Sequence, residues 1–316
     1  MKKDTAVALR NEYISRVNKV QDYIEMNVSE GFSLNQLAQI AGFSSYHFHR
    51  IFYSITGETL FQYIQRIRLE KAARFLVINQ KMSIMDIALE CGFSNQSSFA
   101  KAFKNYFSLT AANYRACFHK KSNLGKELSE MLDYNSPVRT TPCSTRQKEY
   151  LTAYQIEVKS ISSMDVIYLR YTGPYKSDFP LFENLSSKLD QWAVSKGIQY
   201  TTDTKWLTII HDSPGITEDN KLRISYGMTV HDSNKVIPDG EFGKMRIAGG
   251  RYVIGHFEVA EDEYQAAWNT MYVNWLPESG YQPEDGISFE LYQNNVVTSS
   301  GIQKVDIYIP VKPLRG

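Results

Sequence analysis

Apolar positions in the first third of the chain recur at helical spacing and form two similar segments. The run from Ser33 to Ser44 repeats as the run from Ser83 to Ser94 at an offset of 50 residues, which becomes 51 for the phenylalanines that follow. Periods of this size usually mark a duplicated supersecondary unit. In both copies, apolar residues three and four apart predict a helix with one side facing a core. The sequence therefore predicts the same helical unit twice.

Each copy predicts a helix, a tight turn and a second helix. Ser33 and Gln36 form a capping-box pattern at the start of the first helix. Gly42, and Gly92 in the second copy, provide the left-handed turn conformation that residues with a side chain resist. A turn of three or four residues with a central Gly is typical of a helix-turn-helix. Between the copies, residues 60–76 predict one long helix.

The duplicated unit resembles the DNA-binding domain of the AraC/XylS family of bacterial transcription regulators. The resemblance covers roughly residues 10–118 and rests on the repeated A-x-x-x-G-F-S motif, on the connecting segment Ile64–Leu76 and on the closing pair Tyr114 and Arg115. Family members commonly have a Pro shortly before that pair, where this chain has Leu109–Asn113. Two such units at this spacing make the resemblance specific.

The second helix of each unit can enter the major groove and present its outward side chains to base edges. Arg50 would favour guanine and Gln96 adenine, whereas the repeated phenylalanines lie on the inward spacing and belong to the core. A chain with two such helices can read two segments of double-stranded DNA about one helical turn (~34 Å) apart. With the family pattern as a guide, the candidate DNA-binding residues are Tyr46, His49, Arg50, Gln96, Ser97, Lys101 and Lys104.

From residue 154 the pattern changes to alternating strands with helices between them. Val166–Tyr171 and Tyr252–Phe257 each alternate as a strand and each precede an aromatic-rich helix, and Trp192 aligns with Trp275 at an offset of 83. We therefore expect a multidomain chain. It has an all-α double helix-turn-helix domain (residues 1–120), a linker (121–153), and an α+β domain (154–316) of two pseudo-twofold related strand-helix-strand repeats.

The second half resembles the gyrase-inhibitor-like (GyrI-like) effector-binding domain found in several regulators of multidrug and stress responses. The resemblance rests on Tyr171–Pro174, Trp275–Tyr281, Phe289–Tyr292 and Val305–Val311. An AraC-type module followed by this domain is the arrangement of the Rob-like regulators. The resemblance implies a cleft lined by aromatic residues, with a buried acid that receives cationic, apolar ligands. The candidate ligand-binding residues are Glu290, Tyr171, Trp268, Trp275, Tyr292 and Tyr168.

The distribution of charge and aromatic residues agrees with two tasks. Residues 1–121 contain 16 Lys and Arg against 9 Asp and Glu, a net charge of +7, whereas residues 122–316 contain 19 against 25, a net charge of −6. A basic module suits a polyanion such as DNA. All four tryptophans lie in the second half. Aromatic faces with one carboxylate suit an organic cation, so we expect a small cationic or amphipathic effector.

Other classes of protein fit less well. No window approaches the ~18 consecutive apolar residues of a membrane span, and no apolar signal segment follows Met1. Three scattered cysteines argue against a disulfide scaffold or a structural zinc site. We expect a cytoplasmic regulator with no cofactor, metal site or catalytic residue, whose partners are DNA, the effector and RNA polymerase. Two alternatives remain for the second half: a hydrolase that uses Glu290 with Tyr292 or Tyr171, and a protein-interaction module.

Overall fold

The chain folds into two compact units, which are described separately. One comprises Met1–Arg146 with Ser213–Asp219, and the other comprises Gln147–Asp212 with Asn220–Gly316. The computed structural model describes residues 2–79, 81–118, 154–175, 178–198, 200–212, 216–230, 236–260, 263–284, 286–292 and 302–313. The predicted linker, residues 121–153, lies outside these ranges.

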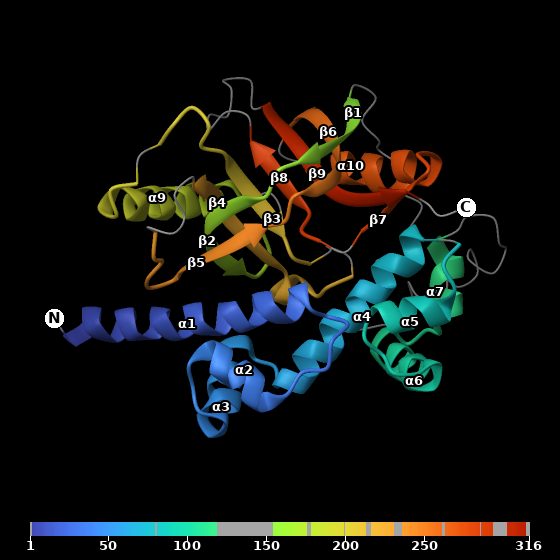
Figure 1. The fold of residues 1–316 in the computed structure, drawn as a ribbon, viewed down its shortest axis with the longest axis horizontal. Coiled ribbons are helices and arrows are strands. Elements are labelled where there is room, and N and C mark those ends of the chain that lie inside the picture. The colour runs from blue at the N-terminus through green and yellow to red at the C-terminus, as the bar shows by residue number, and fades with distance from the viewer. Residues whose placement is uncertain are drawn as a thin grey trace. The chain divides into compact units, whose positions relative to one another are not determined.

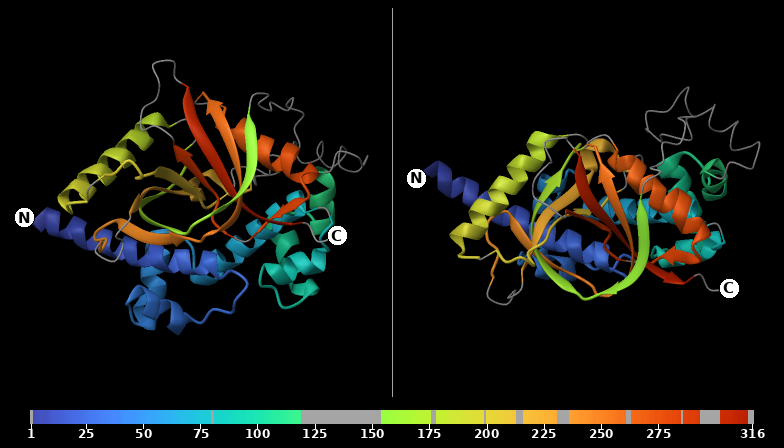
Figure 2. Two further views of the ribbon diagram at one scale, coloured as in Figure 1. Left: turned by 45° about the horizontal axis from the view of Figure 1, so that its top comes forward. Right: turned by 90° about the horizontal axis from the view of Figure 1, so that it is seen from above.

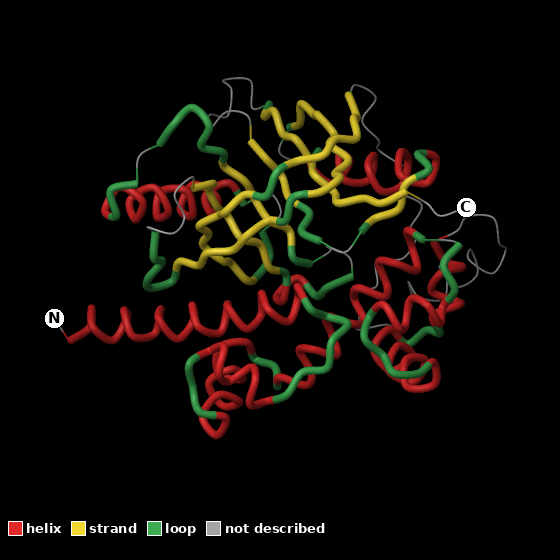
Figure 3. Tube along the Cα trace, viewed as in Figure 1, coloured by secondary structure: helices red, strands yellow, loops and turns green. Residues whose placement is uncertain are grey.

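The described part of the first unit is helical (Figures 1 and 3). Ser33 Oγ accepts from the Gln36 amide at 3.2 Å at the start of α2, and Thr59 with Gln62 forms a complete capping box before α4. Such bonds satisfy amides that have no partner within the helix. The helices are α1 (Lys2–Met26), α2 (Leu34–Ala41), α3 (Ser45–Thr56), α4 (Leu60–Ile78), α5 (Ile84–Glu90), α6 (Gln96–Phe107) and α7 (Ala111–Phe118).

Two apolar cores share the long helix α4, as the duplicated sequence predicts. The first core joins α1, α2 and α3 to the first half of α4, and the second core joins α5, α6 and α7 to its second half. The inward phenylalanines Phe48, Phe52, Phe99 and Phe103 are all fully buried. Each helix-turn-helix therefore has its own core, and α4 connects them.

The described part of the second unit contains a nine-stranded sheet whose paired strands are all antiparallel, in the order β1-β6-β9-β8-β3-β4-β2-β5, with β7 added at β9. Long alternating runs of β-branched and aromatic residues favour such strands. The strands are β1 (Gln155–Ile161), β2 (Met164–Thr172), β3 (Trp206–Ile210), β4 (Arg223–Val230), β5 (Phe242–Ile247), β6 (Gly250–Val259), β7 (Tyr281–Pro283), β8 (Phe289–Tyr292) and β9 (Gln303–Pro313).

The strand order confirms the predicted pseudo-twofold repeat. Reading inward from the two edges gives β5-β2-β4-β3 on one side and β1-β6-β9-β8 on the other, so β2, β3 and β4 correspond to β6, β8 and β9. The helix of the first repeat is α9 (Phe179–Ser195). In the second repeat α10 (Tyr264–Asn269) continues as a π-helical segment, Thr270–Trp275, and a 3-10 turn, Leu276–Glu278. Figure 2 shows both helices against the sheet.

The two faces of the sheet have different environments. Phe289 and Leu291 of β8 belong to a core on one face, whereas Tyr292 packs with the cluster beneath α9 on the other face. Glu290 alternates with Phe289 and Leu291 and hydrogen-bonds to Trp268 of α10. Both helices therefore cover the face that carries Glu290. Within the described ranges, no helix has the length and apolar character needed to cross a bilayer.

Candidate nucleic-acid interface and effector-binding site

Helices α3 and α6 are the second helices of the two helix-turn-helix units. The turns before them contain Gly42 (φ 67°) and Gly92 (φ 79°), both in the left-handed conformation that favours glycine. In Figure 1, α4 runs between the two helix-turn-helix units, with α3 near its first half and α6 near its second half. Two recognition helices joined by one long helix suit the reading of two segments of a duplex.

The predicted DNA-binding side chains are exposed on these two helices. Tyr46 is 64% exposed, and the Arg50 guanidinium lies 5.2 Å from the centre of its ring. This cation–π contact holds the arginine along the outer face of α3. The structure also leaves His49, Gln96, Ser97, Lys101 and Lys104 exposed. All seven residues are therefore accessible to a partner.

A buried carboxylate, Glu290, lies on the sheet face covered by α9 and α10. Trp268 Nε1 donates to Glu290 Oε1 at 2.6 Å, and the Tyr292 hydroxyl lies 2.9 Å from Glu290 Oε2. The same hydroxyl lies 2.8 Å from Thr208 Oγ1, on the neighbouring strand β3. Glu290 is 6% exposed, and its hydrogen-bond partners among the described residues are neutral. The acid is therefore buried beside aromatic groups, and no basic side chain among the described residues forms a hydrogen bond with it.

Burial shifts the pKa values of Glu290 and Tyr292. Desolvation raises the pKa of Glu290, and the hydrogen bonds from Trp268 and Tyr292 only partly oppose that rise. Burial, followed by the nearby charge of Glu290, raises the pKa of Tyr292 well above its ordinary value. Tyr292 therefore keeps its proton and remains a hydrogen-bond donor to the carboxylate.

The other predicted ligand-binding aromatics make different contacts. Tyr168 is fully buried in the core on the opposite face of the sheet, because it alternates with Tyr171 along β2. Tyr171 is on the helix-covered face, but its hydroxyl donates to Pro174 O of its own turn at 3.1 Å. Trp275 stacks on Tyr281, with ring centres 6.3 Å apart. The structure therefore brings Trp268 and Tyr292 to Glu290, and it places Tyr168 on the other face of the sheet.

Comparisons with known proteins match both units. A family model described as a GyrI-like small molecule binding domain matches residues 154–312, and a helix-turn-helix domain model matches residues 37–116. PqrA of Proteus vulgaris, a probable transcription factor, is 39% identical over 101 residues, which cover 31% of this chain and 82% of PqrA. The chain belongs to the AraC-type regulators with a GyrI-like domain.

Two further matches concern the second unit of this AraC-type regulator. A DNA gyrase inhibitor of Yersinia enterocolitica is 29% identical over 150 residues, which cover 46% of this chain and 90% of the inhibitor. The crystal structure of the EcmrR C-terminal domain covers 51% of this chain and 98% of its own, at 21% identity and a TM-score of 0.43. The two family models describe a regulator that combines a helix-turn-helix region with a small-molecule-binding domain.

Two residues of the regulator that lie near Glu290 are not among the ligand-binding residues predicted from the sequence. Thr208 pairs with Glu290 in the β3–β8 register, 82 positions apart in sequence, and contacts Tyr292. Tyr175 lies close enough to Glu290 for the carboxylate, after burial, to raise its pKa. Strand pairing between distant segments is the signal that locates Thr208, and the sequence alone does not supply it. In the described residues no group of three His, Cys, Asp or Glu is placed to hold a metal ion.

Proposed function

We propose that the regulator binds an organic cation at Glu290 and thereby changes its binding to DNA. The observation that supports this proposal is a buried carboxyl group whose described hydrogen-bond partners are neutral. Ionised, such a group costs several kcal/mol unless a positive charge accompanies it. A cationic ligand supplies that charge, whereas a neutral or anionic ligand does not.

The surroundings of Glu290 add the second element of cation recognition. Trp268 and Tyr272 stack with ring centres 5.9 Å apart and an interplanar angle of 14°. Aromatic faces attract cations most strongly where water is excluded. An amphipathic cation with an aromatic or alkyl body gains from both the rings and the carboxylate.

Calorimetric titration tests this proposal. The full chain is titrated with tetraphenylphosphonium, a quaternary ammonium amphiphile and a planar aromatic dye cation. We expect Glu290→Gln to weaken the tightest of these by roughly 30-fold or more, because it removes the buried partner of the ligand charge. Glu183→Gln is the matched control, since Glu183 is exposed on α9 of the same unit. Equal affinity of Glu290→Gln and the unmodified chain would refute the role of Glu290.

Proton release provides a second measurement in the same titrations. The raised pKa of Glu290 extends to higher pH the range in which the free protein carries its proton, and a bound cation favours the ionised form. Binding should therefore release protons and strengthen as pH rises toward and through the pKa of the free protein. Repeating the titration in buffers of different ionisation enthalpy measures the release, which Glu290→Gln should abolish.

In the first unit, we propose that α3 and α6 read two adjacent major-groove segments. Tyr46, His49 and Arg50 on α3 and Gln96, Ser97 and Lys101 on α6 would face the bases, and Lys104 a phosphate; their exposure supports this assignment. Selection of bound DNA from random sequences, with and without the cation, should return a two-part motif and a change in yield. A one-part motif would contradict reading by two helices.

The alternatives for the second unit make different predictions. Glu290 and Tyr292 are in hydrogen-bond contact, as a hydrolase would require, but the matched relatives of the first unit are regulators. Chromatography of each ligand after incubation detects turnover, and we expect none. A protein-interaction module would bind none of the cations. A regulator acts where bacterial DNA lies, in the cytoplasm, and RNA polymerase stays a predicted partner with no residue assigned.

A further inference from the structure

The two apolar cores of the first unit do not by themselves join the two recognition helices. Tyr63 and Ile67 of α4 belong to the first core, with α3, whereas Leu69 and Leu76 belong to the second, with α6. The spacing and angle between α3 and α6 must therefore depend on α4 and on contacts that pass from one core to the other. Polar side chains make such contacts in the middle of α4.

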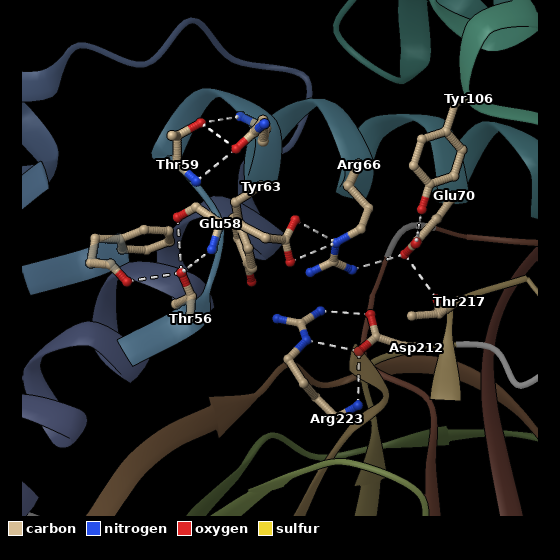
Figure 4. A network of polar contacts seen from close by, with 12 residues as sticks. Thr56, Glu58, Thr59, Tyr63, Arg66, Glu70, Tyr106, Asp212, Thr217 and Arg223 are labelled. Carbon is tan, nitrogen blue, oxygen red and sulfur yellow. Dashed lines mark hydrogen bonds and ion pairs between the residues drawn. The ribbon is translucent and has the colours of Figure 1, made fainter. Parts of the chain in front are cut away.

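A continuous chain of polar contacts runs from the end of α3 to α6 (Figure 4). Glu58, in the connection from α3 to α4, accepts from Arg66 Nε at 2.9 Å and 3.1 Å. Arg66 Nη1 donates to Glu70 Oε2 at 3.2 Å, and the Tyr106 hydroxyl donates to Glu70 Oε1 at 2.8 Å. Glu58, Arg66 and Glu70 lie on or just before α4, and Tyr106 lies on α6. We call these four residues the α4 polar chain.

The α4 polar chain is well suited to fixing geometry. Glu58, Arg66 and Glu70 are between 4% and 8% exposed. Buried charges contribute little net stability compared with apolar packing, but a lost partner leaves an uncompensated charge, so they disfavour other arrangements. Burial, and then the charge of Glu70, raise the pKa of Tyr106, so Tyr106 stays a donor. A change in the angle between the two helix-turn-helix units would break one of these bonds.

We propose that the α4 polar chain sets the spacing between the two DNA segments that the regulator accepts. Its members are positioning residues, because they are buried and act on DNA only through α3 and α6. The proposal rests on the two-helix reading proposed above. Each inserted base pair moves one segment by about 3.4 Å and turns it by about 35° around the duplex. A rigid connection rejects such a change, whereas a loosened connection accepts it.

The test measures binding of the full chain to a selected operator and to versions with one base pair added or removed between its two parts. For the unmodified chain we expect a loss of at least about fivefold per step, comparable to one mismatched base pair. Tyr106→Phe and Glu70→Gln should bind the selected operator nearly as tightly as the unmodified chain does. On the operators with altered spacing, each variant should lose less than about twofold of that affinity. Tyr13→Phe and Glu90→Gln are matched controls, since both residues are exposed and neither belongs to the α4 polar chain.

The spacing profile separates positioning from general stability. A merely structural role lowers affinity equally at every spacing, so an unchanged profile in Tyr106→Phe and Glu70→Gln would overturn the proposal. Tyr106→Phe removes one hydroxyl only, and circular dichroism confirms its fold. If the unmodified chain itself ignores spacing, the two-helix reading fails, and that outcome differs from failure of the positioning role. In the double variant Glu58→Gln/Tyr106→Phe, the loss of spacing selectivity should be smaller than the product of the losses in the single variants Glu58→Gln and Tyr106→Phe.

Discussion

The two helix-turn-helix units share one sequence pattern but differ in what surrounds their turns. A Cβ atom added to Gly42 would meet only the end of the flexible Arg16 side chain, at 3.3 Å. A Cβ atom added to Gly92 would lie 2.7 Å from the carbonyl oxygen of Val28 and 2.9 Å from Arg68. Arg68 is itself fixed there, because its Nε donates to Val28 O at 3.0 Å. The turn at Gly92 is therefore packed against the backbone of Val28, which lies outside the second helix-turn-helix, whereas the turn at Gly42 is open.

The starts of the two recognition helices differ as well. Asn95 Oδ1 caps α6 by accepting from the Ser98 amide at 2.8 Å. Ser44 occupies the equivalent position before α3 but makes no side-chain cap bond, and its hydroxyl lies 3.0 Å from His47 Nδ1 instead. A repeated motif therefore determines the path of the backbone but not how firmly each copy is held.

The largest expected effect comes from the turn glycines. Gly42→Ala should cost about 1–2 kcal/mol of unfolding free energy, the penalty of a left-handed side-chain residue. Gly92→Ala adds a clash with a fixed carbonyl, so we expect about 3 kcal/mol or more. Urea unfolding followed by circular dichroism measures both. Equal costs for the two variants would show that the packing difference between the turns has no energetic consequence.

The next effect concerns base recognition by the two helices. Arg50→Ala on α3 should lose about 1–3 kcal/mol at one base position and relax specificity there. Gln96→Ala on α6 should do the same at a position in the other half of the operator. Binding to operators with every single substitution locates both positions. If both variants relax the same half of the operator, α3 and α6 do not read separate segments.

Features with a local signal were predictable from the sequence. The spacing of Phe48, Phe52, Phe99 and Phe103 predicted their burial, and Ser33 predicted a helix start. Even there the detail differed. The Gln36 side chain, expected to complete the capping box, donates to the Tyr23 hydroxyl, and the complete box occurs at Thr59 and Gln62.

Features built from distant segments were not predictable in the same way. The sequence shows Arg66 and Glu70 as an ordinary pair one helical turn apart, and nothing local connects them to Tyr106. Around Glu290 the resemblance indicated the acid, whereas alternation along β2 decides that Tyr168 lies on the other face of the sheet. Periodicity assigns faces within one element, but contacts between elements need the register of the sheet.

A smaller effect should distinguish the caps of the recognition helices. Asn95→Ala removes a side-chain bond to an otherwise unpaired amide and should cost about 1 kcal/mol of unfolding free energy. Ser44→Ala removes no such bond and should cost only a few tenths of a kcal/mol. The same urea titration measures both variants. A larger loss for Ser44→Ala would show that its contact with His47 takes the place of a cap.

The smallest expected effect concerns the charge at the ends of α3 and α6. Lys104 lies in the last turn of α6, whereas the last turn of α3 has no basic residue and carries Tyr53 at the matching position. If Lys104 contacts a phosphate, Lys104→Ala should weaken binding to all sequences alike. It should also reduce the slope of log K against log salt concentration by about 0.9, the value for one released counterion. Tyr53→Lys should increase the slope by a similar amount if the two units approach the backbone equivalently. An unchanged slope in Lys104→Ala would make that lysine a solvated charge, and a changed slope in only one variant would mean that the two units dock differently.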